Sequence, residues 1–178
     1  MRVIAGTARG LQLEAPRGDA TRPTLDRVRE ALFSILGPQL PEAAFLDLYA
    51  GSGANGIEAL SRGARQAVFV DNAPAALDIV RRNLAHTRLA ERGRCLRRRL
   101  PQGLADLSGP FDIVFADPPY HAFEPVELLE GLRQSGLVVP DGWIILEHDA
   151  RADAPEVAGG FERFRTAKYG TTSLSLYT

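Results

Sequence analysis

The fold of this chain is decided by the stretch Asp47-Leu48-Tyr49-Ala50-Gly51-Ser52-Gly53-Ala54-Asn55-Gly56, which joins an apolar run to a helical pattern. Its glycines allow a tight turn that brings the backbone close to a ligand. The next apolar run ends at Asp71, 20 residues beyond Gly51. A carboxylate at that position can accept hydrogen bonds from both hydroxyls of a ribose. A strand, a glycine loop, a helix and a second strand ending in an acid predict a site for an adenosine-containing cofactor.

Short apolar runs alternate with helical patterns from residue 44 onward, which is typical of a parallel α/β sheet. Helices are expected to begin at Pro74 and at Pro125, the second with Val126, Leu129 and Leu132 facing inward. The two last runs flank Tyr169-Gly170 and predict an antiparallel hairpin. The expected strands cover seven ranges: residues 45–49, 67–71, 93–97, 111–116, 143–147, 161–168 and 171–177.

Residues 1–40 are predicted to form an extension before a main domain at residues 41–178. Residues 2–5 and 10–14 predict a small hairpin. Thr24 can cap a helix that runs to Leu36. The apolar residues of that helix recur at helical spacing, at Leu25, Val28, Leu32 and Ile35.

The composition indicates one globular domain with no span across a membrane. The chain has 178 residues, of which 45% are hydrophobic, and 18 apolar residues nowhere follow one another. We therefore expect a cytoplasmic protein. Its single cysteine, Cys95, cannot form an internal disulfide, and its three histidines have no metal-ligand spacing, so no metal is expected.

The charges are distributed unevenly along the chain, although the net charge is only −1. Residues 1–105 carry 16 basic and 10 acidic side chains, whereas residues 106–162 carry 12 acidic and 2 basic ones. The basic part could face RNA, because clustered arginines bind phosphates.

A second motif, Asp117-Pro118-Pro119-Tyr120, follows the apolar run at residues 111–116. Two prolines keep the segment extended and remove two backbone donors, which leaves carbonyl oxygens as acceptors. Asp117 and the Pro118 carbonyl could hold the exocyclic amine of a nucleobase while Tyr120 stacks on the ring. The alternative is a strand that ends in a Pro-Pro turn with a solvated aspartate.

The glycine loop also satisfies Gly-x-Gly-x-x-Gly, so a nicotinamide dinucleotide is an alternative cofactor. Asp47 favours another one. An acid beside the loop would repel a pyrophosphate, but it suits the ammonium group of S-adenosylmethionine. A role for Asp47 as a loop cap is an equal alternative.

Together these motifs resemble those of Rossmann-like methyltransferases that act on exocyclic amines. The segments at residues 2–6, 21–33 and 58–64 are more narrowly similar to the RsmD family of bacterial guanine-N2 methyltransferases of small-subunit (16S) rRNA. This resemblance covers residues 1–177. It implies a Rossmann-like α/β fold with a mostly parallel seven-stranded sheet, an antiparallel C-terminal hairpin and helices on both faces. It also implies S-adenosylmethionine as cofactor, and 16S rRNA in the assembled or assembling small subunit as partner.

The site residues predicted on these grounds fall into three groups. The catalytic group is Asp117, Pro118 and Tyr120. The cofactor group is Asp47, Tyr49, Gly51, Ser52, Gly53, Gly56, Asp71 and Asn72. The group for the RNA is Arg22, Arg27, Arg29, Pro119 and Phe123. For three of these residues another role is open, since Arg27 and Arg29 could pair with Asp26 or Glu30, and Phe123 could pack in the core.

One departure from the family pattern concerns the adenine of the cofactor. Such enzymes often carry an acid or amide after the third strand, whereas this chain has Arg97-Arg98-Arg99. The competing functions are a DNA or RNA adenine-N6 methyltransferase, a nicotinamide oxidoreductase and an RNA-binding assembly factor without catalysis. We expect a monomer.

Overall fold

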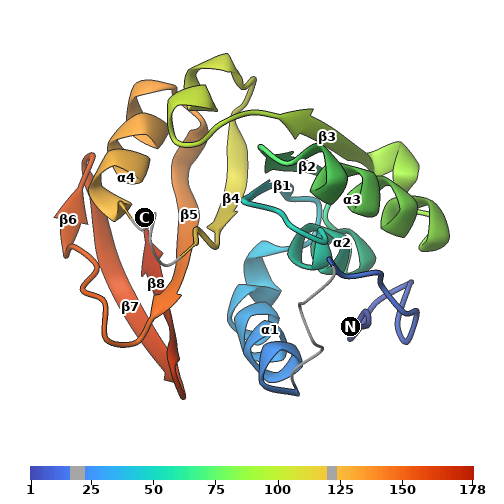
Figure 1. The fold of residues 1–178 in the computed structure, drawn as a ribbon. Helices are drawn as coiled ribbons and strands as arrows, with labels where there is room; N and C mark the ends of the chain where they lie inside the picture. Colours follow the sequence, from blue (N-terminus) through green and yellow to red (C-terminus); the bar gives the residue numbers. More distant parts are fainter. Residues whose placement is uncertain (17–22, 120–123) are drawn as a thin grey trace.

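The structure is a computed structural model that describes residues 1–16, 23–119 and 124–178. Its described part contains one sheet of eight strands in the order β3-β2-β1-β4-β5-β8-β7-β6 (Figure 1). β1 to β5 are parallel, and β8 and β7 follow them antiparallel. The strands are β1 (Ala44–Leu48), β2 (Gln66–Asp71), β3 (Gly93–Arg97), β4 (Phe111–Ala116), β5 (Val138–Asp149), β6 (Val157–Ala158), β7 (Phe161–Tyr169) and β8 (Thr172–Tyr177).

The expected fold class is confirmed, with two differences in the strands beyond shifts of one residue at strand ends. β6 adds two residues at the edge of the sheet beside β7, and this strand is too short to give an alternating pattern. β5 begins at Val138, before the predicted residue 143. Val138 pairs with Phe111 ahead of a register shift, after which Trp143 pairs with Ile113.

Helices cover both faces of the sheet. α1 (Pro23–Leu36), α2 (Ala54–Ser61) and α3 (Pro74–His86) pack on one face, and α4 (Pro125–Gln134) packs on the other together with the 3-10 helix η3 (Gln102–Asp106) (Figure 1). Two further 3-10 turns are η1 (Gly37–Gln39) and η2 (Ala90–Arg92). α3 and α4 begin at the predicted prolines, whereas α1 begins at Pro23, one residue before the expected cap Thr24. The prediction that Val126 faces inward is wrong, because it is 46% exposed and Leu128 is buried in its place.

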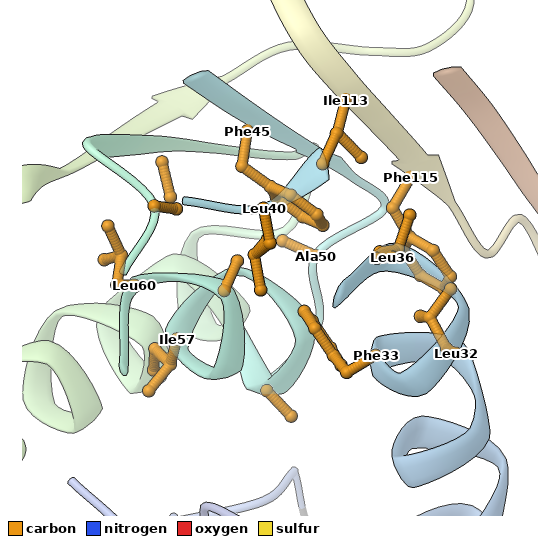
Figure 2. Packing of buried hydrophobic residues seen from close by; sticks show 14 of the residues in the cluster. Leu32, Phe33, Leu36, Leu40, Phe45, Ala50, Ile57, Leu60, Ile113 and Phe115 are labelled. Atoms are coloured by element: carbon orange, nitrogen blue, oxygen red, sulfur yellow. The ribbon is translucent and has the colours of Figure 1, made fainter. Parts of the chain in front are cut away.

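Two apolar clusters, one on each face, hold the central strand in position. All five residues of β1 are buried. Phe45 packs with α1 and α2, where its ring stacks at 6.3 Å on Phe33 (Figure 2). Leu46 and Leu48 belong to the cluster on the α4 side. Because side chains alternate along a strand, burial on both faces fixes which way Asp47 points.

The N-terminal segment forms the expected hairpin in reduced form, as an isolated antiparallel bridge between Arg2 and Gln12. Val3, Ala8 and Leu13 are buried in the same cluster as α1 and α2. The described residues of the range 1–40 thus share their core with the sheet, and the domain boundary at residue 40 stays a prediction.

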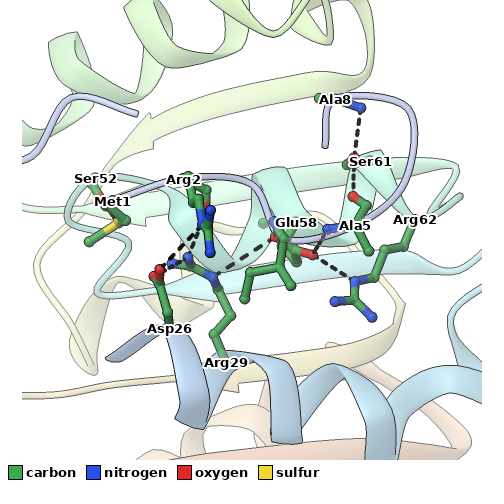
Figure 3. A network of polar contacts seen from close by, with 12 residues as sticks. Met1, Arg2, Ala5, Ala8, Asp26, Arg29, Ser52, Glu58, Ser61 and Arg62 are labelled. Carbon is green, nitrogen blue, oxygen red and sulfur yellow. Dashed lines mark hydrogen bonds and ion pairs between the residues drawn. The ribbon is translucent and has the colours of Figure 1, made fainter. Parts of the chain in front are cut away.

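A buried carboxylate fastens this segment to α2. Glu58 is fully buried and accepts hydrogen bonds from the amides of Ile4 (2.8 Å) and Ala5 (2.9 Å) and from Arg62 Nε (2.7 Å) (Figure 3). Arg29 lies 3.9 Å from the same carboxylate. This network places the first residues of the chain beside the end of the sheet that carries the glycine loop.

Candidate active site

The carboxyl ends of β1, β4 and β5 lie side by side. Leu48 pairs with Ala116, and Ala116 pairs with Leu146, so the next residue on each strand reaches the same edge of the sheet. A pocket of about 240 Å³ opens there. Its lining includes Met1, Arg29, Asp47, Tyr49, Gly51, Ser52, Asp117 and Glu147.

The glycine loop has the left-handed backbone that its glycines allow. Gly51 has a φ of 53° and Gly53 a φ of 76°, and Gly53 caps α2. A Cβ at Gly51 would meet nothing within 4 Å, whereas one at Gly56 would lie 2.3 Å from Phe69 Cε1. Gly56 therefore lets α2 pack closely on β2, and Gly51 leaves open space at the pocket.

Asp71 holds this loop from the end of β2. Its Oδ2 accepts a hydrogen bond from the Gly51 amide at 3.0 Å, and its Oδ1 accepts one from the Ala73 amide at 2.9 Å. The carboxylate is thus fixed beside the glycine turn, and its role toward a ribose stays a prediction. Asn72 is exposed, and its backbone oxygen accepts a hydrogen bond from Arg97 Nε at 3.2 Å.

Asp47 is buried beneath the loop, with 2% of its surface exposed. Its Oδ2 accepts a hydrogen bond from the Gly56 amide at 2.9 Å. One oxygen of Asp47 therefore caps the loop, as the alternative interpretation expected. Burial raises the pKa of Asp47 to about 8, and the nearby charges of Asp117 and Asp71 add to this effect. A cation bound beside this buried acid would favour its ionised form.

Asp117 follows β4 and is exposed at the pocket, with its amide 3.5 Å from the Leu48 oxygen. Pro118 is buried and Pro119 is exposed. Tyr120 and Phe123 lie outside the described residues, so their roles stay predictions.

Tyr49, which was predicted from the sequence, and Met1, which was not, also line the pocket. Burial raises the pKa of Tyr49 to about 12, with Glu127 and Glu124 adding to the shift, so its hydroxyl remains a donor. Met1 reaches the pocket from the N-terminal segment, where its sulfur accepts a hydrogen bond of 3.4 Å from Ser52 Oγ. The hairpin at residues 2–14 brings Met1 there, and the N-terminal sequence contains no motif that signals this contact.

Glu147 is a residue of the pocket that was not predicted from the sequence. This half-buried acid lies near the end of β5 and lines the pocket together with Asp117. Burial raises the pKa of Glu147 to about 8, Asp117 adds to the shift and Arg29 opposes it. An apolar strand running into an acid is the pattern that identified Asp71 and Asp117, and residues 143–147 share it.

This chain is similar over its whole length to proteins of one family. The family model described as "Conserved hypothetical protein 95" matches residues 1–178. The chain is 35% identical to "Ribosomal RNA small subunit methyltransferase D" of Escherichia coli (strain K12), over 99% of this chain and 89% of that protein. The chain belongs to the RsmD family. Its identity with the Bacillus subtilis protein YlbH is 37%, over 99% of this chain and 98% of that one.

Solved structures agree with membership of the RsmD family. The Escherichia coli protein yhhF superposes with a TM-score of 0.85 at 34% identity, over 99% of this chain and 96% of that one. The resemblance expected from three short segments is therefore confirmed over the whole length.

The arginines predicted to bind RNA differ in their settings in this RsmD-family chain. Arg29 is 5% exposed and donates hydrogen bonds to the Arg2 oxygen (2.6 Å) and to Asp26 Oδ1 (2.8 Å) (Figure 3). The pairing with Asp26, one of the two alternatives for this residue, is thus what the structure shows. Arg27 is exposed on α1, and Arg22 lies outside the described residues.

The arginines at the end of β3 lie beside Asp71, whose backbone oxygen accepts a hydrogen bond from the Arg98 amide at 3.1 Å. Arg98 forms an ion pair with Asp106 at 3.5 Å.

In the described part of the chain, no three acid, histidine or cysteine side chains are grouped as metal ligands. Among the helices described, none is both long and apolar enough to cross a bilayer.

Proposed function

We propose that this protein transfers a methyl group from S-adenosylmethionine to the exocyclic N2 amine of a guanine in 16S rRNA. The observation that carries the proposal is that one pocket is lined both by the glycine loop, whose Gly51 amide Asp71 holds, and by Asp117. The name of the Escherichia coli relative supports an rRNA of the small subunit as substrate. We further propose that the protein acts in the cytoplasm, as a monomer, on the assembled or assembling small subunit.

The residues present suit this cofactor. Gly51 leaves room for a ligand against the backbone, and Asp71 lies beside it as an acceptor for ribose hydroxyls. Asp47 places an acid below the loop, where an ammonium group would favour its ionised form. When bound, S-adenosylmethionine supplies an activated methyl group on a cationic sulfur. Tyr49, Ser52, Gly53, Gly56 and Asn72 complete the proposed cofactor site.

The residues on the other side of the pocket suit an amine. A guanine N2 is a poor nucleophile because its lone pair is delocalised into the ring. Hydrogen bonds from the amine to the Asp117 carboxylate and the Pro118 carbonyl would orient that lone pair and favour a pyramidal nitrogen. Asp117 can take the proton that the methylated nitrogen loses.

We propose that Tyr120, with Phe123 and Pro119, stacks on a guanine that leaves its RNA loop, because unpaired bases are readily extruded. Arg22 and Arg27 would contact phosphates of the same RNA. For Arg29 we propose a role in holding the N-terminal segment, because its guanidinium is buried and paired.

The test measures transfer of labelled methyl groups from S-adenosylmethionine to small subunits and to naked 16S rRNA, both unmethylated at the target. Nucleoside mass spectrometry then identifies the product. We expect N2-methylguanosine from the wild type, a loss of about 100-fold or more in Asp117→Ala, and full activity in Asp78→Ala, an exposed control on α3. N6-methyladenosine would instead assign the protein to the adenine methyltransferases. Cofactor binding without any transfer would favour an assembly factor.

A further inference from the structure

Glu147 and Asp117 occupy matching positions on neighbouring strands. Ala116 pairs with Leu146, so each acid follows a residue of that pair. Phe115 and Ile145 pack in one core cluster, and Ala116 and Leu146 pack in the other. Because side chains alternate along a strand, both acids project to the face that α1 covers. Neighbouring strands lie about 5 Å apart, which places the two carboxyl groups side by side in the pocket.

The order of strands separates Glu147 from the proposed cofactor site. Asp71 ends β2 and the glycine loop follows β1, whereas β4 lies between β1 and β5. Asp117 at the end of β4 therefore has the cofactor residues on one side and Glu147 on the other. Glu147 therefore lines the β5 side of this pocket, beyond Asp117 as seen from the glycine loop.

A guanine presents two adjacent kinds of donor on one edge, the N1–H and the N2 amine, whereas adenine has an unprotonated N1 beside its amine. We propose that Glu147 determines the specificity for guanine by accepting a hydrogen bond from N1–H while Asp117 holds the N2 amine. This inference rests on the proposed function and identifies the edge of the guanine that the pocket would recognise. A carboxylate at this position would repel the lone pair of an adenine N1.

The charges around Glu147 agree with this role. The acids Asp117, which follows β4, and Asp47 on β1 share the pocket with it, and the Tyr49 hydroxyl stays protonated. Arg29 from α1 and Met1, which carries the N-terminal amine, also line the pocket. Burial raises the pKa of Glu147 to about 8 in the free protein, the charge of Asp117 adds to the shift and that of Arg29 opposes it. A donor edge of guanine would stabilise the ionised form, so binding of the base and loss of the proton are coupled.

The test compares Glu147→Gln, Glu147→Asp and Glu162→Gln, the last an exposed control on β7. Calorimetry gives the Kd of S-adenosylmethionine for each variant. Methyl transfer to unmethylated small subunits at saturating cofactor gives kcat/KM between about pH 6 and 9. In Glu147→Gln we expect cofactor affinity within about twofold of wild type and kcat/KM lower by about ten- to a hundred-fold.

The pH dependence of kcat/KM distinguishes a hydrogen bond from the base to Glu147 from a purely structural role of this side chain. The ionised fraction of Glu147 grows as pH rises toward about 8, so wild-type kcat/KM should rise over that range and then level off. Glu147→Gln should lose this rise, and Glu147→Asp, which retains a carboxylate, should keep it at reduced activity. Glu162→Gln should match the wild type.

Three results would overturn the proposal. One is a wild-type value of kcat/KM in Glu147→Gln, and another is an equal loss in both Glu147 variants with the rise intact. In either case N2-methylguanosine from the wild type would leave the proposed function standing. The third is a wild-type product other than N2-methylguanosine, which would remove both proposals together.

Discussion

At the scale of single residues, two glycines of the N-terminal segment share a backbone conformation but differ in their surroundings. Gly6 and Gly10 both have a φ of 85°. A Cβ at Gly6 would lie 1.9 Å from the Ser61 oxygen, whereas one at Gly10 would meet nothing within 4 Å. We expect Gly10→Ala to lower the free energy of unfolding by about 1 to 2 kcal/mol and Gly6→Ala to lower it further. Urea unfolding measures both, and equal losses would contradict the packing of Gly6 against α2.

Asp71 carries a prediction for cofactor binding. Loss of charge-assisted hydrogen bonds worth about 1.5 to 3 kcal/mol should weaken binding of S-adenosylmethionine by about ten- to over a hundred-fold in Asp71→Ala. Calorimetry gives the Kd, with Asp78→Ala as the exposed control. Because Asp71 also holds the Gly51 amide, Asp71→Asn should recover part of the affinity. An unchanged Kd in Asp71→Ala would remove this residue from the cofactor site.

The individual site residues were predictable where a motif contained them. Asp47, Gly51, Asp71 and Asp117 lie around one pocket or hold its loop, because parallel strands end at a common edge. Glu147 also follows an apolar run, but no glycine loop or Pro-Pro turn adjoins it in the sequence, and the pairing of β4 with β5 is what places it at the pocket.

At the scale of elements, the contact between the N-terminal segment and α2 depends on one carboxylate. Glu58 accepts hydrogen bonds from two backbone amides and from Arg62. A glutamine would replace one of the acceptor oxygens by an amide donor that faces these donors. In Glu58→Gln we expect amide hydrogen exchange at Ile4 and Ala5 to accelerate by at least about tenfold.

The control for this prediction is Glu14→Gln in the same segment. Glu14 forms an exposed ion pair with Arg82 at 2.9 Å, and such pairs contribute little to stability. Exchange at Ile4 should therefore match the wild type. Equal acceleration in both variants would show that Glu58 does not fasten the segment.

Elements with strong periodicity were predictable from the sequence, and their boundaries less so. α3 and α4 begin at the predicted prolines because proline suits the first turn of a helix. Val126 misled the prediction for α4, since apolar spacing alone does not show which of two adjacent faces meets the sheet. The sequence offered Asp26 as a partner for Arg29, but the burial of Arg29 and its approach to Glu58 required the fold, because Glu58 lies on another element.

At the scale of the whole molecule, two acids with raised pKa values link folding to pH. Asp47 and Glu147 have pKa values of about 8 in the folded protein, against about 3.9 and 4.3 in an unfolded chain. Between these values the folded state binds more protons, so the contribution of both groups is present in full below about pH 4 and is lost as pH rises through about 8.

We therefore expect the free energy of unfolding of the ligand-free protein to receive a falling contribution from these acids between about pH 5 and 8. Urea unfolding at several pH values measures the slope. The double variant Asp47→Asn with Glu147→Gln should have a less negative slope. The same slope in both proteins would contradict the raised pKa values.

Burial of Asp47 beneath the glycine loop also decides the heat that accompanies cofactor binding. At neutral pH this acid is protonated in the free protein, and a cation bound beside it would expel the proton into the surrounding buffer. The observed binding enthalpy should then differ between phosphate and Tris, in proportion to the ionisation heats of the two buffers, and the difference should shrink in Asp47→Asn. Titrations in two buffers would thus count the protons that leave the protein, and a zero count would mean that Asp47 keeps its proton when the cofactor binds.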